Sequence, residues 1–347
     1  MRRNMGRIFY LDAVNGNDEN SGIAPDAALK SLEAANQILF GAGDKLLLKC
    51  GCEWKGMLCP HGDGDRFQFA QIGTYGDGKA PLIDGNGAYA AILLDGVSYW
   101  KVKGLRICNH SSERCVRQGI CISAKSEGIT AGIEISDCEI FEVDGENRRA
   151  MPVYQSMYWN GAVYVTFPGR TSAQDHLHDI VISNNYIHDV RTSGIRVNQQ
   201  EDFINDIHHT HVVVRGNRIE RTGSDGIIVA NCISPLIDSN VCFDAGALGT
   251  LEDTQLIAGI WVCATRDALI QRNEVARTRM FENDGTAFDT DWETAGTTVF
   301  QYNYSHDNEG GFWLDCMKLN HNRDCEKTIL RYNISMRDGR GIAVYDQ

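Results

Sequence analysis

Short apolar segments that follow a glycine recur along most of this chain. The first and third residues after the glycine are mostly apolar, and the segments begin at Gly119, Gly161, Gly194, Gly226, Gly259, Gly285, Gly311 and Gly341. A period of two predicts β-strands with one buried face. No segment between these strands has the length and apolar spacing of a helical crossover, so the pattern favours an all-β fold.

A second set of apolar segments carries an asparagine and repeats on the same scale. The segments ISNNYI, VRGNRI, IDSNVC, IQRNEV, FQYNYS and LRYNIS contain Asn185, Asn217, Asn240, Asn273, Asn303 and Asn333, spaced by 32, 23, 33, 30 and 30 residues. Short strands at such intervals, without helices between them, predict a solenoid in which each repeat forms one coil and like strands stack in parallel sheets. We expect the asparagines to stack and to hydrogen-bond from coil to coil.

We therefore predict one parallel β-helix domain over residues 1–347, with residues 1–60 as the N-terminal cap and first coils and residues 99–347 as the repeat coils. The segment ALKSLEAANQIL after Pro25 places its apolar residues on one face and predicts a short capping α-helix over the first coil. The chain stops at Gln347, directly after a core strand. We expect this last coil to be uncapped and able to pair with another copy of the chain.

Strand alternation assigns each side chain of the glycine strands to the core or to the outer face of the sheet. Counting from the last six glycines, the first and third residues are apolar except Thr286, which places Phe312 and Leu314 in the core. The second and fourth residues should face outward, among them Arg196, Asn198, Trp261, Asp289, Trp313 and Asp315. Tryptophan exposed beside carboxylates indicates a binding surface.

Asp289 and Asp315 occupy the same place on successive coils in this count, 26 residues apart. Neighbouring strands lie ~4.8 Å apart, so the two carboxyl groups are expected about 5–6 Å from each other, the separation that retaining glycosidases use. Like charges at that distance leave one carboxyl protonated. We expect one of the pair to be the nucleophile and the other the general acid/base, with Asp291, two residues farther along the same face, tuning them.

The predicted substrate groove runs along this outer stripe. Most insertions fall between the asparagine and glycine markers and should line one edge, whereas the insertion that carries Glu201 follows a glycine strand and should line the other. Trp261 and Trp313 are expected to stack on sugar rings, and Arg196 and Asn198 to bind hydroxyl or carboxylate groups. The remaining predicted substrate-binding residues are Trp292, His306 and Glu201.

Composition limits the classes of binding partner and the cellular location that we expect. The net charge of −13 argues against nucleic acid, and no apolar run approaches the ~20 residues of a membrane span. The N-terminus lacks an apolar signal core, and most of the twelve cysteines lie in strand segments as small hydrophobic residues. Both features favour the cytoplasm without fixing the location. Ordinary thiols and a polar loop are favoured over zinc at Cys50, Cys52 and Cys59 and at His208, His209 and His211, so no metal site is predicted.

The opening FYLDAVNGNDENSGIAPDAALKSLEAANQIL and the coil FQYNYSHDNEGGFWLD resemble the entry segment and repeat coils of the pectin-lyase-like superfamily of right-handed parallel β-helix proteins. The resemblance covers nearly the whole chain and implies a carbohydrate-active protein. Several hydrolases of this fold place acidic residues on adjacent coils of one sheet, an arrangement that Asp289, Asp291 and Asp315 match. The polygalacturonase series of Asn-Thr-Asp, Asp-Asp and Gly-His-Gly is absent.

Three functions follow from these features. The paired carboxylates and aromatic residues favour a glycoside hydrolase that acts on an oligo- or polysaccharide without a cofactor. A polysaccharide lyase acting by β-elimination on a uronate polymer would instead use the three aspartates to hold Ca²⁺, with Lys318 or Arg196 as the base. In a non-catalytic glycan-binding β-helix, Asp289 and Asp315 would only bond turn amides.

Overall fold

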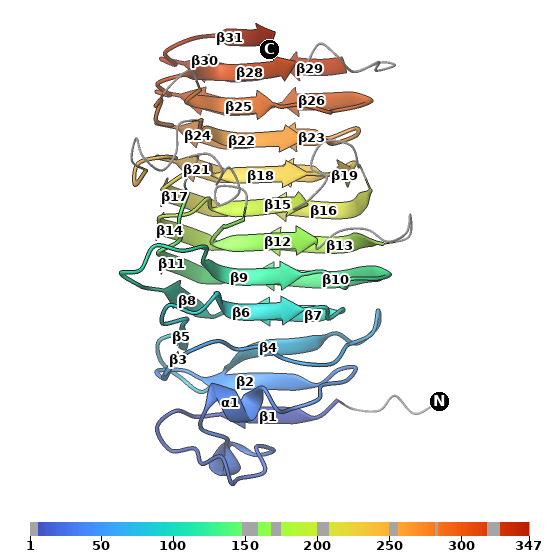
Figure 1. Cartoon of the computed structure of the whole chain (residues 1–347), viewed down its shortest axis with the longest axis vertical. Coiled ribbons are helices and arrows are strands. Elements are labelled where there is room, and N and C mark those ends of the chain that lie inside the picture. The colour runs from blue at the N-terminus through green and yellow to red at the C-terminus, as the bar shows by residue number, and fades with distance from the viewer. Residues whose placement is uncertain are drawn as a thin grey trace.

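The computed structural model describes residues 6–147, 159–167, 175–199, 208–249, 256–281, 284–317 and 327–346. These residues form three parallel sheets that stack coil upon coil, with the N-terminal and C-terminal strands at opposite ends of the stack (Figure 1). The predicted all-β parallel solenoid is confirmed.

Each sheet collects one strand from most coils. The first sheet contains β1 (Ile8–Leu11), β2 (Lys45–Lys49), β4 (Ala70–Tyr75), β7 (Trp100–Lys103), β10 (Ile129–Ser136), β13 (His176–Ser183), β16 (His209–Arg215), β19 (Cys232–Ile233), β20 (Leu236–Asp238), β23 (Leu269–Gln271), β26 (Thr297–Gln301) and β29 (Lys327–Arg331). The second contains β3 (Glu53–Lys55), β5 (Leu82–Asp84), β8 (Arg106–Asn109), β11 (Glu139–Val143), β14 (Tyr186–Val190), β17 (Arg218–Thr222), β21 (Val241–Phe243), β24 (Glu274–Ala276), β27 (Tyr304–His306) and β30 (Ile334–Met336). The third contains β6 (Ala90–Asp95), β9 (Gln118–Ser123), β12 (Val163–Phe167), β15 (Ile195–Gln199), β18 (Ile227–Ala230), β22 (Ala258–Cys263), β25 (Thr286–Thr290), β28 (Gly311–Met317) and β31 (Ile342–Asp346).

A continuous apolar core lies between the three sheets. In one coil, Ile180 of β13, Ile187 of β14 and Ile195 of β15 all belong to this core and are fully buried. The alternating apolar residues of the glycine strands therefore cover the inner face of the third sheet, and burial of these side chains drives each coil onto the next.

The asparagines form the predicted ladder at the turns between the first and second sheets. The side-chain amide of Asn217 donates to Oδ1 of Asn240 at 3.0 Å, and Asn240 donates to Asn273 at the same distance. From Asn217 onward, each Oδ1 also accepts the backbone N–H of the preceding asparagine, as Asn240 does from Asn217, whereas Oδ1 of Asn185 accepts the N–H of Cys138. The ladder runs unbroken from Asn185 to Asn333. Buried turn amides, which would otherwise lack partners, are thereby satisfied.

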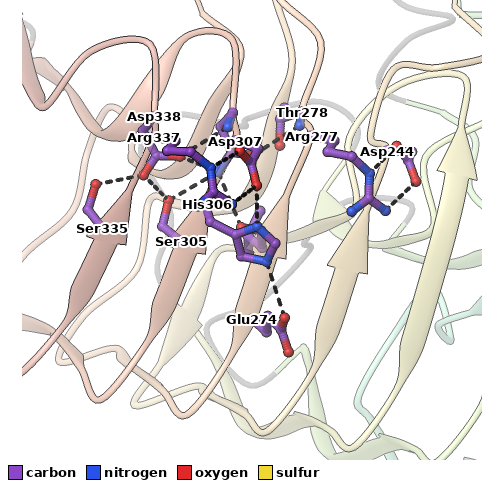
Figure 2. A network of polar contacts seen from close by, with 12 residues as sticks. Asp244, Glu274, Arg277, Thr278, Ser305, His306, Asp307, Ser335, Arg337 and Asp338 are labelled. Atoms are coloured by element: carbon purple, nitrogen blue, oxygen red, sulfur yellow. Dashed lines mark hydrogen bonds and ion pairs between the residues drawn. The ribbon is translucent and has the colours of Figure 1, made fainter.

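A second ladder, of ion pairs, follows the strands of the second sheet. Its members alternate in charge from coil to coil, and each acid is held by two hydrogen bonds from the arginine of the next coil: Asp189–Arg221, Asp244–Arg277 and Asp307–Arg337, with donor–acceptor distances of 2.6–2.8 Å. All six residues have φ between +52° and +58°. Figure 2 shows the last two pairs.

The predicted capping helix is wrong as a continuous element. A 3₁₀ turn spans Pro25–Ala27, and α1 covers only Leu32–Ala35, with Ser31 as its N-cap. Leu29 between them forms a parallel bridge with Leu11, and its N–H donates to the carbonyl of Tyr10. Leu29 of the apolar face that suggested a helix is thus buried by bridging to the first strand, whereas Leu32 and Ala35 are buried from α1. The short α1 lies at the N-terminal end of the stack (Figure 1).

The cysteines of the described residues are free thiols. Cys121, Cys138, Cys232 and Cys242 are buried in strands or turns, as expected for small hydrophobic residues, and burial raises the pKa of the Cys138 thiol to about 12. No helix in the described part of the chain is long and apolar enough to span a membrane.

Candidate active site

The outer face of the third sheet carries its own apolar cluster, separate from the main core. Ile228, Trp261 and Cys263 belong to it, and Trp292 packs against it. Strand pairing sets Ile228 beside Trp261, and Trp261 beside Asp289 on the next coil. The prediction that Trp261 and Asp289 face outward from the solenoid core is confirmed, although both side chains are buried, with 7% and 5% of their surface exposed.

Five aspartates interact electrostatically around the C-terminal half of the third sheet. Asp289 lies in β25, and Asp291 follows two residues later on the same side of the chain. Asp284 precedes the strand, Asp315 lies on β28 of the next coil, and Asp225 directly precedes Gly226 and β18. The charges of the other members of this acidic cluster raise the pKa values of Asp289 and Asp291, so these carboxyl groups are electrostatically linked.

Asp289 is almost completely buried, with 5% of its surface exposed. Burial, followed by the charges of Asp291 and Asp284, raises its pKa well above the ordinary range. Its Oδ1 is buried and has no hydrogen-bond partner among the described residues. Burial and the neighbouring charges therefore favour the protonated form of Asp289.

Asp291 is half-buried and reaches solvent. Burial raises its pKa to about 7, and among neighbouring charges Asp284 contributes most, followed by Asp225 and Asp315. A hydrogen bond of 2.9 Å from the backbone N–H of Trp292 to Oδ1 partly opposes this rise. A carboxyl group that titrates near neutrality and is accessible to a ligand is suited to general acid catalysis.

The predicted register between Asp289 and Asp315 is wrong. In the pairing of β25 with β28, Asp289 lies opposite Leu314, and Asp315 lies opposite Thr290. Adjacent positions on a strand point to opposite faces, so the two carboxyl groups do not form one outward column. The argument for a separation of about 5–6 Å, and with it the geometric case for a retaining pair, therefore fails.

The same shift reverses the prediction for Trp313. Its indole lies in the main core, 6.3 Å from the ring of Phe300, and Nε1 donates to Oγ1 of Thr290 at 3.3 Å. Trp313 thus cannot serve as a sugar platform on the outer face. Leu314, predicted to be in the core, pairs with the outward-facing Asp289.

Arg196 faces outward from the solenoid core but is fully buried. Its Nη2 lies 3.4 Å from Oδ2 of Asp225 and 3.3 Å from Oγ of Ser193. The prediction that Arg196 presents its guanidinium to a substrate is therefore not met in this structure. The side chain of Asn198 and the whole of Glu201 lie outside the described residues.

His306 lies on β27 in the second sheet, away from the predicted groove. Its Nδ1 is 2.7 Å from Oδ2 of Asp307, and its Nε2 is 3.2 Å from Oε1 of Glu274 (Figure 2). These two acids and the adjoining Arg337–Asp307 pair hold the imidazole within the ion-pair ladder. The placement of His306 among the substrate-binding residues is corrected accordingly.

Asp225 and Asp284 were not among the residues predicted from the sequence. Each immediately precedes the glycine of a glycine strand, in Asp225-Gly226 and Asp284-Gly285. That shared Asp-Gly position was the available signal, because it places an acid at the entry to the third sheet on two coils.

The insertions between the second and third sheets border a pocket of about 280 Å³. The side chains around it include those of His110, Arg114, Asp144 and Arg191, and the backbone at Gly223 lies two residues before Asp225. The predicted edge of loops is thus hollowed, on coils that precede those of Asp289, Asp291 and Asp315. No group of three or more histidine, cysteine, aspartate or glutamate side chains within the described ranges is arranged to hold a metal ion.

No protein-family model matches this sequence. The chain is 27% identical to the lacto-N-biosidase of Bifidobacterium longum subsp. longum over 97% of its length. It spans only about a quarter of that relative, 26%.

Solved structures give a closer view of the fold. The GH136 lacto-N-biosidase of Eubacterium ramulus superposes with a TM-score of 0.74 at 21% identity, covering 98% of this chain and 68% of that one. An alginate lyase from Paenibacillus sp. superposes with a TM-score of 0.61 at 16% identity, covering 91% and 96%. The chain therefore has the same parallel β-helix fold as these two proteins.

Proposed function

We propose that the chain is a glycoside hydrolase that acts on an oligosaccharide of the kind cleaved by its lacto-N-biosidase relatives. The observation that carries the proposal is Asp291, a half-buried carboxyl with a pKa of about 7 amid other carboxyl groups on the outer face of the third sheet. The similarity to a lacto-N-biosidase along 97% of the chain supports it.

In the proposed mechanism, Asp291 is the general acid that protonates the departing glycosidic oxygen. Asp284 is the partner carboxylate. It either takes a proton from the water that adds to the anomeric carbon, or attacks that carbon itself to form a glycosyl ester that water then hydrolyses. We choose Asp284 because it is half-buried and is the neighbouring charge that most raises the pKa of Asp291. Asp289 stays buried and uncharged beneath them. Asp315 lies on the following coil and adds to the negative potential that favours an oxocarbenium-like transition state.

The apolar cluster with Trp261 and Trp292 provides a wall beside Asp291. We propose that no cofactor is needed. The protons held by Asp289 and Asp291 lower the charge of the acidic cluster, and Arg196, the base named for a lyase, is buried against Asp225. This arrangement favours hydrolysis over β-elimination.

The proposal is tested by incubating the protein with an aryl lacto-N-bioside and with a panel of oligo- and polysaccharides. Release of a reducing sugar, with the anomer followed by NMR, is the expected result, and a chelator should leave the rate unchanged. Ultraviolet absorbance from an unsaturated uronate, lost on adding the chelator, would show a calcium-dependent lyase instead. Binding to a glycan without turnover would show a non-catalytic module.

We expect kcat/KM to fall as the pH rises through about 7. The general acid must carry its proton in the free enzyme, and Asp291 loses that proton above its pKa, so the active form is the one present at lower pH. Measuring kcat/KM for one glycoside over the full pH range tests this decrease. A rate that stays constant from pH 6 to 9 would contradict the assignment of Asp291 as the acid.

A further inference from the structure

Asp225 joins three consecutive coils through one buried carboxyl group, which is 2% exposed. On the coil before, Arg196 donates to its Oδ2, and on its own coil Oγ of Ser224 donates to the same oxygen at 3.0 Å. On the coil after, the backbone N–H of Ala258 and Nε1 of Trp261 donate to Oδ1 at 3.0 and 2.9 Å. The two oxygens of Asp225 thus fix both the path of the chain into β22 and the direction of the Trp261 indole.

The fixed indole lies beside the segment that carries Asp291. Trp261 belongs to the outer apolar cluster against which Trp292 packs. The carbonyl of Trp292 accepts the backbone N–H of Ala264 at 2.7 Å, which ties it to the same coil as Trp261. The N–H of Trp292 in turn donates to Oδ1 of Asp291. A continuous path of contacts therefore runs from Arg196 to Asp291.

We infer that Asp225 is a positioning residue for Asp291. Asp225 fixes Trp261 in the outer apolar cluster, against which Trp292 packs. Together with Arg196, Asp225 also sets the electrostatic field at the Asp291 carboxyl. The inference rests on the proposed function, in which Asp291 is the acid. The titratable groups that face Asp291 are Asp284 and Asp289 on its own coil, Asp315 and Cys316 on the next, and Asp225 two coils before.

Mutations distinguish the two parts of the inference, which are the effect of the Asp225 charge and the effect of the fixed Trp261 indole. D225N keeps an oxygen that can accept from Trp261 but removes the negative charge, so the titration midpoint of Asp291 should fall by about one pH unit. R196Q leaves the charge of Asp225 unbalanced, so the midpoint should rise. The double variant D225N/R196Q should return the midpoint toward that of the wild type. W261F removes the indole donor and no charge, so it should lower kcat by about ten- to a hundredfold and leave the midpoint in place.

The midpoint is read from the NMR shift of the Trp292 backbone amide against pH, because Oδ1 of Asp291 is its acceptor. D238N, which removes the acid of the Asp238–Arg272 pair on the first sheet, is the matched control and should change neither midpoint nor kcat. Opposite shifts in D225N and R196Q support the inference, since a merely structural role would not reverse sign. A wild-type midpoint in folded D225N overturns it.

If D225N does not fold, W261F carries the test, and wild-type kcat in W261F overturns the positioning role. The NMR titration needs no substrate. If the wild-type protein cleaves no glycoside but the midpoints shift as described, the proposed function fails while the coupling of Asp225 to Asp291 stands. If glycosides are cleaved and the midpoints do not move, the function stands and this inference fails.

Discussion

Asp291→Asn is expected to lower kcat/KM by about two to four orders of magnitude on glycosides whose leaving group needs a proton. Asparagine keeps the size of the side chain and can still accept the N–H of Trp292, but it has no acidic proton to donate. The loss should be much smaller for aryl glycosides with acidic phenols, which depart without protonation. Steady-state rates over a series of leaving groups measure this dependence.

Asp238→Asn is the control, because it makes the same chemical change in an acid that pairs with Arg272 at 2.6 Å on the first sheet. It should leave the rates within twofold of the wild type, about the scatter of such measurements. If Asp291→Asn retains more than about a tenth of the wild-type rate with poor leaving groups, Asp291 is not the acid. Asp289 or Asp315 would then be the next candidate for that role.

Asn240→Ala is expected to destabilise the protein by about 3–5 kcal/mol, because it strips partners from buried groups of two neighbouring coils. The backbone N–H and the side-chain amide of Asn217 lose their acceptor. The carbonyl of Val214 loses its donor. The midpoint and slope of urea-induced unfolding measure the change.

Asn184→Gly provides the comparison for this stability prediction. Asn184 is exposed, lies directly before the first asparagine of the ladder, and has a φ of +56°, which glycine accepts. Its free energy of unfolding should stay within about 1 kcal/mol of the wild type. A loss below about 1 kcal/mol in Asn240→Ala would mean that water replaces the ladder bonds in the altered turn.

The features that could be read from the sequence are those that repeat. An asparagine that recurs among apolar residues every 23 to 33 positions must be buried on each coil, and stacking on its neighbours satisfies it. The apolar columns that contain Ile195, Ile227 and Ile260 were likewise predictable, because alternation over many coils leaves one choice of inner face. The prediction of a capping helix failed because its pattern does not repeat. Its apolar spacing occurs once, and Leu29 could bury itself by bridging Leu11 as well as by helix formation.

The acidic site was only partly predictable, because one residue of register decides which side chains meet. Gly310 and Gly311 are adjacent, and the assignment of alternate residues to the inner and outer faces was counted from Gly311. Gly311 pairs with Thr286 inside the sheet, so counting from Gly310 would have placed Trp313 inward. The roles of Asp225 and Asp284 depend on contacts among coils far apart in sequence, and periodicity carries no information about those contacts.

The alternating ion pairs of the second sheet limit how this solenoid can change length. Along six coils the charge at the ladder position runs Asp189, Arg221, Asp244, Arg277, Asp307 and Arg337. Deleting or duplicating a single coil there would bring two arginines or two aspartates together at the junction, whereas adding or removing two coils would keep every acid next to a base. The ion pairs in this part of the protein therefore favour changes of length by two coils, even though the hydrophobic core repeats with every coil.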